Sequence, residues 1–240
     1  KPNIYWQMQN AIKGMAEAAR ALNTPVVSGN VSLYNESADR AIFPTPVVGM
    51  VGLMPDIARR QGMAFKDEGD RIVLLGELNQ ELGGSEHLYL AYGLEKGAVP
   101  PADLEREKSL IELLLDLAEN QILASCHDIS EGGLAVALAE SAIKGKIGFK
   151  VNLEHPASRW DGLLFSEAPG RAVVSVKPAK LDELVEKARA WGVPCLMLGR
   201  VEGSNLLYQG NGQELIGIAL DQAISTWGDA IRCSMTLKTK

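Results

Sequence analysis

The sequence has 240 residues, 46% of them hydrophobic and 22% charged, and its formal net charge at pH 7 is −6. That length and composition allow one large buried core or two smaller ones, as in a globular protein. The 24 lysines and arginines are dispersed, and no apolar run approaches the roughly 18 residues of a membrane-spanning helix. We therefore expect neither nucleic acid nor a membrane among the partners.

The cysteines indicate the compartment. Cys126, Cys195 and Cys233 are odd in number and show neither a CxxC pair nor a Cys/His metal spacing. The N-terminus lacks the charge, apolar run and cleavage site of a signal peptide. We expect a reducing, cytoplasmic location.

The first predicted element is a helix over residues 4–22. Apolar residues recur there at steps of three or four, from Ile4 to Leu22, and Asn23 is a plausible left-handed stop. The chain enters this helix directly from Lys1, with no initiator Met. We therefore expect the chain to be a fragment of a longer protein.

A strand with a polar face is predicted over residues 24–36. Ser28, Asn30 and Ser32 alternate with apolar residues and share one face. Gly29 would let a phosphate approach the backbone, Asn30 offers a neutral oxygen to Mg²⁺, and Ser32 can donate to a substrate oxygen. The alternative is an ordinary solvated edge strand in which Gly29 marks a bulge.

A second, continuously apolar strand is predicted over residues 46–54, after a loop over 35–44. Residues 55–70 then change character to a short helix and a charged stretch that contains glycine. We place the domain boundary here, with the first domain over 1–66 and the second over 67–240.

In the second domain strands and helices alternate. We expect strands over residues 71–76, 149–153, 171–176 and 195–201, another from residue 122, a hairpin around residues 210–212, and helices over 101–120, 134–143, 180–191 and 220–231. Residues 163–170 are predicted to form a turn. This order of elements indicates an α+β domain with a mixed sheet.

Two glycine pairs in this domain resemble phosphate-binding turns. The first is the pair in LGGSEHL, residues 82–88, which is a weak signal by itself. The second is Gly132-Gly133, where His127 or Asp128 would carry a proton or orient a ligand. In the structural alternative, Ser130 is simply the N-cap of the following helix.

The run VSGNVSLYNES, followed by PTPVVGMVGLM, resembles the synthetase subunits of phosphoribosylformylglycinamidine synthase (FGAM synthase). It is most similar to the small type, in which the glutaminase is a separate protein. The resemblance implies that Gly29 contacts ATP, Asn30 binds Mg²⁺ and Ser32 contacts the substrate.

The motif HDISEGGLAVALAE resembles the aminoimidazole ribonucleotide synthetase superfamily. This implies an α+β, aminoimidazole ribonucleotide synthetase-like fold, with a partial N-terminal α/β domain followed by a complete C-terminal α/β domain. Residues 1–66 would end the first, ATP- and substrate-binding domain of the second repeat. The segment LFSEAPGR resembles the family's Ser-Glu turn, but Ala168 and Pro169 stand where a substrate-reading copy carries polar groups, so we expect a structural turn.

The implied activity belongs to de novo purine biosynthesis. ATP activates the formyl amide oxygen of formylglycinamide ribonucleotide, and ammonia from the glutaminase subunit displaces the phosphoryl group. The implied partners also include a small accessory subunit and the upstream half of the same polypeptide. The family's catalytic histidine would lie upstream of Lys1, so we expect no catalytic residue in this chain, and the fragment alone is expected to be inactive.

Two alternatives stay open at this point. One is another ATP enzyme of the same superfamily, of the selenophosphate or thiamine-phosphate type. The other is a scaffold half that holds an auxiliary nucleotide or none and has no catalytic role.

Overall fold

The computed structural model describes residues 2–32, 42–156 and 159–236. The chain divides into two compact units, residues 1–57 and 58–240. The domain boundary between residues 66 and 67 remains a prediction. The second unit nevertheless includes Phe65, which is 1% exposed and belongs to its core.

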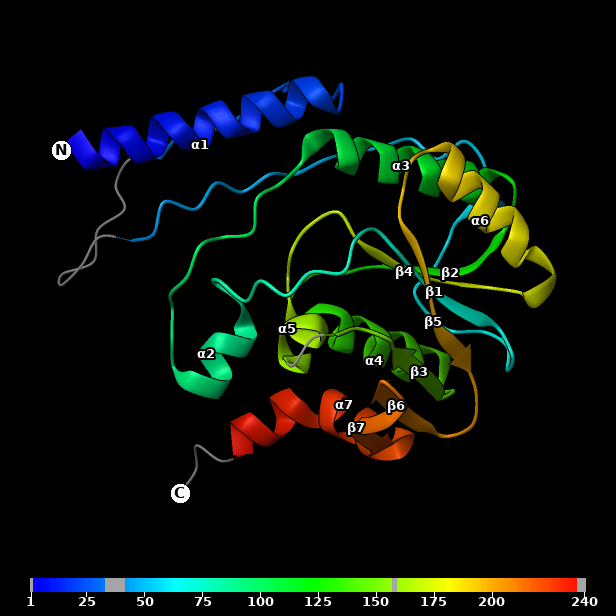
Figure 1. Ribbon diagram of the computed structural model, residues 1–240. Helices are drawn as coiled ribbons and strands as arrows, with labels where there is room; N and C mark the ends of the chain where they lie inside the picture. The colour runs from blue at the N-terminus through cyan, green and yellow to red at the C-terminus, as the bar shows by residue number, and fades with distance from the viewer. Residues whose placement is uncertain (1, 33–41, 157–158, 237–240) are drawn as a thin grey trace. The chain divides into compact units, whose positions relative to one another are not determined.

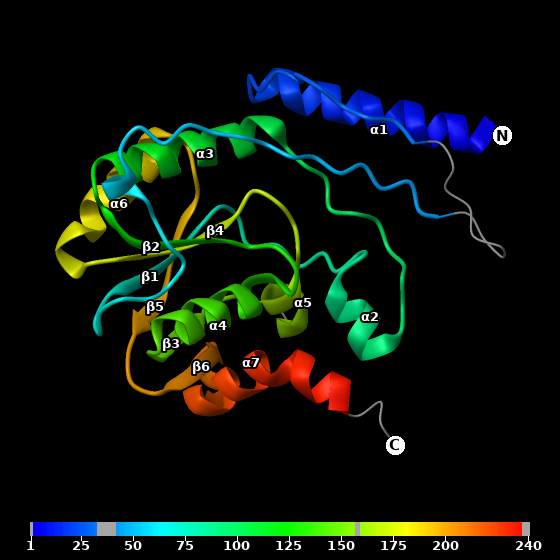
Figure 2. The same ribbon diagram turned by 180° about the vertical axis from the view of Figure 1, so that it is seen from behind.

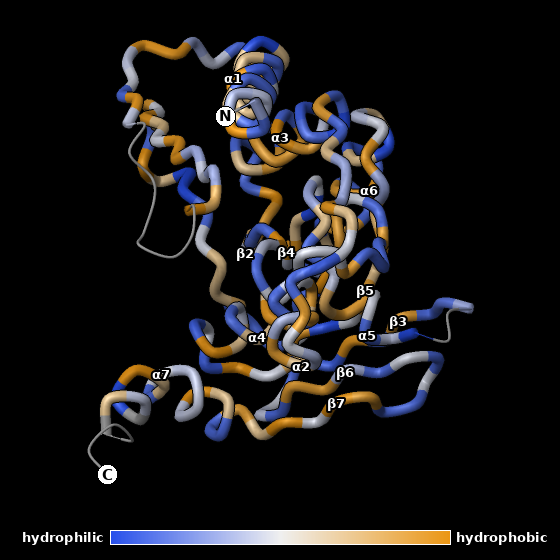
Figure 3. Tube along the Cα trace, turned by 90° about the vertical axis from the view of Figure 1, so that its left-hand side faces the viewer, coloured by the Kyte–Doolittle hydropathy of each residue, from blue (hydrophilic) through white to orange (hydrophobic). Residues whose placement is uncertain are grey.

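The first unit contains helix α1 (Pro2–Ala21), which confirms the predicted helix. Residues 22–32 and 42–56 contain no helix or strand, so the strands predicted over 24–36 and 46–54 are wrong wherever the structure describes them; residues 33–36 lie outside it. An apolar segment becomes a strand only when another strand supplies its hydrogen bonds. Val27 and Val47 are instead 91% and 92% exposed. Figure 3 shows how much hydrophobic sequence these extended segments carry.

The second unit is built on one seven-stranded sheet. Its strands are β1 (Arg71–Leu75), β2 (Leu123–Asp128), β3 (Phe149–Leu153), β4 (Ala172–Val176), β5 (Cys195–Val201), β6 (Asn205–Gly210) and β7 (Gln213–Ala219). The order across the sheet is β2-β4-β1-β5-β3-β6-β7. Among the strand pairs that the structure describes, β3–β6 is parallel and the others are antiparallel, which confirms the expected mixed sheet.

Helices cover both faces of this sheet (Figures 1 and 2). The α-helices after α1 are α2 (Glu86–Tyr92), α3 (Leu104–Glu119), α4 (Gly133–Gly145), α5 (Trp160–Phe165), α6 (Leu181–Ala190) and α7 (Leu220–Thr236), and there are short 3-10 turns η1 (Ile57–Arg59) and η2 (Pro178–Lys180). α3 and α6 pack on one face, and α4, α5 and α7 on the other. No helix in the described part of the chain is both long and apolar enough to cross a membrane.

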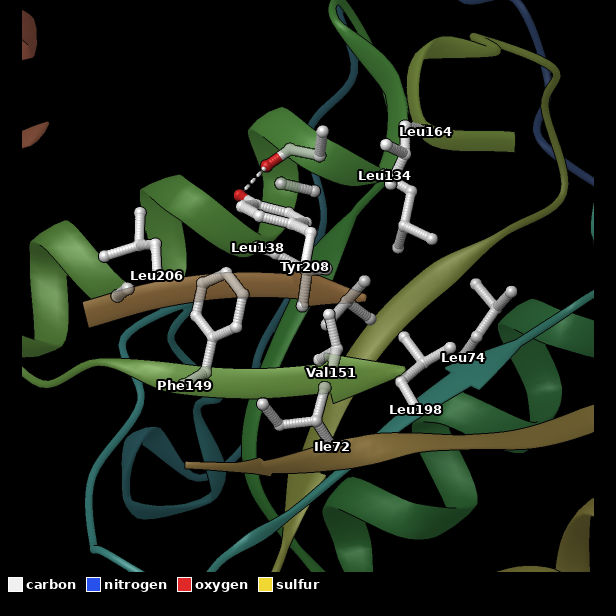
Figure 4. Close-up of a cluster of buried hydrophobic side chains, with 14 of the residues drawn as sticks. Ile72, Leu74, Leu134, Leu138, Phe149, Val151, Leu164, Leu198, Leu206 and Tyr208 are labelled. Atoms are coloured by element: carbon white, nitrogen blue, oxygen red, sulfur yellow. Dashed lines mark hydrogen bonds between the residues drawn. The ribbon is translucent and has the colours of Figure 1, made fainter. Parts of the chain in front are cut away.

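Alternation along β1 explains this three-layer arrangement. Ile72 and Leu74 point into the core beneath α4, and Val73 and Leu75 into the core beneath α3 and α6. In the first core the rings of Phe149 and Tyr208 meet edge to face, 5.0 Å between centroids (Figure 4). β1 is therefore buried on both faces, in a sheet that forms the middle layer of the second unit.

Most predicted elements of this unit are confirmed, with two corrections. The predicted start of a helix at residue 101 is wrong, because the Asp103 side chain accepts hydrogen bonds from the Glu105 and Arg106 amides and caps α3 there. The turn predicted over residues 163–170 begins only after α5, which ends at Phe165.

Candidate functional site

Gly29, Asn30 and Ser32 lie on an exposed segment of the first unit. The Asn30 Nδ2 atom donates a hydrogen bond to Ser32 Oγ at 3.2 Å, so the two predicted ligand-binding side chains meet. A Cβ added at Gly29 would contact nothing within 4 Å. Because the segment is not a strand, Gly29 does not form the bulge of the alternative interpretation. No packing contact in the described chain requires glycine at this position.

Asn30 provides one oxygen suited to Mg²⁺. Its amide nitrogen is engaged with Ser32, and the carbonyl oxygen lies on the opposite arm of the amide. Mg²⁺ prefers hard oxygen ligands and keeps several waters, so a neutral amide oxygen fits one coordination position. The described residues contain no cluster of three or more His, Cys, Asp or Glu side chains that could complete a metal site. Asn30 therefore offers one oxygen, without a group of three or more such side chains beside it in the described chain.

His127, which with Asp128 is one of two predicted alternatives for a proton carrier or ligand orienter, sits at the end of β2 between two carboxylates. Its side chain is 8% exposed; Nδ1 lies 3.1 Å from Asp128 Oδ1 and Nε2 lies 3.0 Å from Glu140 Oε2. An ionised carboxylate only accepts hydrogen bonds, so both contacts are satisfied when both ring nitrogens carry hydrogen. The Glu140 contact ties β2 to α4, the Asp128 contact stays within β2, and together they engage both ring nitrogens.

The start of α4 already holds an anion from the protein itself. The structural alternative predicted Ser130 as the N-cap of this helix, and that prediction is wrong. Gly132, with φ +79°, occupies the N-cap position. The Glu167 carboxylate accepts hydrogen bonds from the Gly132 amide at 2.8 Å and from the Glu86 amide at 2.9 Å. One carboxylate therefore accepts a hydrogen bond from a backbone amide at the start of both α4 and α2. It lies where a phosphate bound to these amides would lie.

The other glycine pair is explained by packing. A Cβ at Gly83 would lie 1.8 Å from the carbonyl oxygen of Ala98, so only glycine allows this close approach of the two backbone segments. Ser85 then caps α2 by accepting a hydrogen bond from the Leu88 amide. Sequence reasoning missed this contact because the two segments are separated by the whole of α2.

The side chain of Arg171, which is 4% exposed, stabilises the Ser-Glu turn by hydrogen bonds to its backbone. Its Nε and Nη2 atoms donate to the carbonyl oxygens of Ala168 and Ser166, at 2.9 and 2.7 Å. Burial lowers the pKa of Arg171 to about 10. The Ser166 hydroxyl donates to Asn79 at 3.0 Å. Sequence reasoning expected a structural turn here, but it missed the roles of Glu167 and Arg171.

Comparison with known proteins identifies the family. The sequence profile of the C-terminal domain of AIR synthase related proteins matches residues 67–208, and that of the N-terminal domain matches residues 1–54. The chain belongs to the AIR synthase related proteins.

Within this family the chain is most usefully compared with phosphoribosylformylglycinamidine synthase subunit PurL. It is 47% identical to PurL of Thermoanaerobacter sp. (strain X514) over 235 residues, which is 98% of this chain and 32% of that protein. It is 45% identical to PurL of Moorella thermoacetica over 231 residues, 96% of this chain and 31% of that protein. The predicted resemblance to FGAM synthase is confirmed. The chain spans about a third of the length of these relatives.

Solved structures confirm the expected AIR synthase-like α+β fold. T. maritima PurL complexed with FGAR superposes with a TM-score of 0.61 at 20% identity, covering 70% of this chain and 30% of that one. T. maritima PurL complexed with ATP gives a TM-score of 0.59 at 21% identity, covering 70% and 28%. At these identities the likeness establishes the fold alone.

Proposed function

We propose that this chain supplies part of the ATP, Mg²⁺ and ribonucleotide site of an FGAM synthase. The reaction is the ATP- and ammonia-dependent conversion of formylglycinamide ribonucleotide to formylglycinamidine ribonucleotide, in de novo purine biosynthesis. The observation that carries the proposal is the 47% identity to a PurL subunit over 98% of this chain.

Three residues of the first unit have assigned roles. The backbone at Gly29 is open to the ATP phosphates, the carbonyl oxygen of Asn30 binds Mg²⁺, and the Ser32 hydroxyl donates to the ribonucleotide. When bound, Mg²⁺ neutralises phosphate charge and aligns the transferred phosphoryl group. The hydrogen bond between Asn30 and Ser32 supports the assignment because it fixes the two side chains relative to each other.

We propose the remaining partners on the same basis. Ammonia comes from a glutaminase subunit, a small accessory subunit completes the assembly, and all of them act in the cytoplasm; a T. maritima structure described as PurLQS supports a multi-subunit enzyme. The upstream half of the polypeptide contributes the catalytic residues and covers the apolar segments of the first unit. Residues 1–66 act as the end of an ATP- and substrate-binding domain, and residues 67–240 as its companion domain.

The test is Asn30→Ala in a full-length protein that contains this chain. We expect turnover with ammonium salts to need a higher Mg²⁺ concentration, since one metal ligand is lost from an exposed segment, while the melting temperature stays unchanged. Asn10→Ala is the matched control, because Asn10 is also exposed and its side chain donates a local hydrogen bond to the Trp6 carbonyl. An unchanged Mg²⁺ dependence in Asn30→Ala would refute the assignment.

A second candidate is a scaffold role without catalysis. It is favoured by the Glu167 carboxylate, which occupies the start of α4 where a nucleotide phosphate would otherwise bind. The same experiment separates the two functions, because a scaffold predicts normal turnover in Asn30→Ala at every Mg²⁺ concentration.

A further inference from the structure

The sequence contains one Asn-Gly pair, Asn211-Gly212, and this pair forms the turn between β6 and β7. Both residues have positive φ, 49° and 80°, as a two-residue hairpin turn requires. Glycine has no side chain to shield its backbone amide, so an asparagine in front of it is the most prone to deamidation. Asn211 is also exposed, and water therefore reaches it.

Deamidation is an attack by the chain on its own side chain. The Gly212 amide nitrogen loses its proton to a base in solution and attacks the side-chain carbonyl carbon of Asn211. A C–N bond forms, the bond between that carbon and Nδ2 breaks, and Nδ2 leaves as ammonia with a proton from water. Water then opens the succinimide ring at one of its two carbonyls and leaves aspartate or isoaspartate. The reaction therefore needs a free Gly212 N–H and an Asn211 side chain that can turn towards it.

In the folded chain, β3 and the residues after it engage both reacting groups. The Gly212 amide donates a hydrogen bond to Asn152 Oδ1 at 2.9 Å, which holds the proton on the attacking nitrogen. The Asn211 Oδ1 atom accepts a hydrogen bond from the His155 amide at 3.1 Å, and Asn211 Nδ2 donates to the His155 carbonyl oxygen at 3.0 Å. Each reacting group must therefore give up its partner before the ring can close.

The backbone of the turn is fixed as well. The Asn211 amide donates to the Leu153 carbonyl oxygen at 3.0 Å, which continues the pairing of β3 with β6. A Cβ added at Gly210 would lie 2.7 Å from the ring of Trp160, so this ring packs directly against the backbone in front of the turn. A shift of the turn that brings the Gly212 nitrogen to the side chain therefore disturbs these contacts too.

We propose that Asn211 is a latent deamidation site, which Asn152 and the backbone of His155 protect in the folded chain. Conversion to aspartate or isoaspartate replaces the Nδ2 donor by a carboxylate oxygen, which repels the His155 carbonyl oxygen. Isoaspartate also adds a methylene to the backbone of a two-residue turn. The modification thus weakens the contact that prevents it. This site lies in the second unit and does not depend on the catalytic role proposed above.

The first test compares the 240-residue chain with a peptide of residues 207–216 in mildly alkaline buffer. Peptide mapping by mass spectrometry measures aspartate and isoaspartate at position 211 over time. We expect the folded chain to deamidate at least about tenfold more slowly than the peptide, because hydrogen bonds must first break. In guanidinium chloride the chain should react like the peptide in the same solution. Equal rates in the folded chain and the peptide would overturn the proposal.

The second test removes one protecting hydrogen bond. Asn152→Ala deletes the acceptor of the Gly212 amide, and we expect about three- to tenfold faster deamidation of Asn211. Asn152→Asp keeps an oxygen for that amide and should react like the wild-type chain. Asn205→Ala is the matched control, because Asn205 is exposed at the other end of the same hairpin, opposite Ala219.

Melting temperatures show which variants are folded. If Asn152→Ala does not fold, the comparison of the folded wild-type chain with the denatured chain and the peptide decides. An unchanged rate in a folded Asn152→Ala chain contradicts the proposal. A folded Asn152→Asp chain that reacts as fast as Asn152→Ala contradicts it too, since the acceptor oxygen would then have no protecting effect.

Discussion

Asn30 and Ser32 are two residues apart, and their side chains touch across an exposed stretch of chain. This contact is the strongest feature of the candidate site at the scale of single residues. His127 differs from this exposed pair because its side chain is buried and each of its two ring nitrogens contacts a carboxylate. The first arrangement leaves polar groups accessible to a ligand, whereas the second uses them to hold the fold together.

Ser32→Ala in the full-length enzyme should raise the KM for the ribonucleotide. The expected loss is that of one neutral hydrogen bond, about 0.5–1.5 kcal/mol, with the KM for ATP unchanged. Steady-state kinetics with each substrate varied in turn provides the measurement. A selective effect on ATP would instead assign Ser32 to the nucleotide.

His127→Ala should reduce stability more than turnover. The substitution leaves the partly buried Glu140 carboxylate without its hydrogen-bond donor, which costs about 1–3 kcal/mol. Thermal unfolding and ATPase assays on the same full-length variant check this. Loss of activity at an unchanged melting temperature would show that His127 takes part in the reaction.

At the scale of secondary structure, α3 and α6 are joined by one polar clamp on the face they share. Both Asp116 carboxylate oxygens accept hydrogen bonds from Lys187 Nζ at 2.9 Å, and one also accepts from Trp191 Nε1 at 3.3 Å. Asn120 donates to the same carboxylate at 2.7 Å. The Lys187 hydrogen bond is the main cause that lowers the pKa of Asp116.

Asp116→Asn should therefore destabilise the chain in a pH-dependent way. Because the folded-state pKa lies below the usual aspartate value of about 3.9, the stabilisation is fully present above that value and disappears as the pH falls through the folded-state pKa. For this partly exposed clamp we expect about 1 kcal/mol or less. Urea unfolding of wild type and variant at pH 6 and pH 3 tests the sign, since the difference should shrink at the lower pH.

At the scale of the whole molecule, the two units differ in how much they bury. The second has a core on each face of its sheet, including Leu113, Leu138 and Phe149 with no measurable exposure. Helix α1 of the first unit has no buried residue. Among the residues that the structure describes, the packed interior that independent stability requires therefore lies in the second unit.

A protein of residues 58–240 should unfold cooperatively, with the same midpoint as the 240-residue chain. The 240-residue chain should also self-associate through the first unit, because Val27, Val47 and Val51 are exposed on segments whose backbone lacks strand partners. Thermal unfolding and light scattering on both proteins provide the test. A 58–240 protein without a cooperative transition would contradict independent folding of the second unit. A monomeric 240-residue chain would contradict self-association through the first unit.

The sequence by itself determined elements whose signals are local. Residues 149–153 and 195–201 are strands with the predicted bounds, and the hairpin forms at Asn211-Gly212, where both residues have positive φ. The short turn and the alternating side chains carry that information within a few residues of chain. The family, too, is evident from two short motifs, VSGNVSLYNES and HDISEGGLAVALAE.

Tertiary structure decided what depends on distant chain. The alternating segment from residue 24 and the apolar run at residues 46–54 predicted strands, but a strand exists only where another segment supplies its hydrogen bonds, and here none does in the described chain. Likewise, the glycines at 132 and 133 suggested an anion site, but the anion is Glu167, 35 residues further along the chain. Neither the missing strand partner nor the Glu167 contact leaves a periodic pattern in the sequence, since each depends on which remote segments the fold brings together.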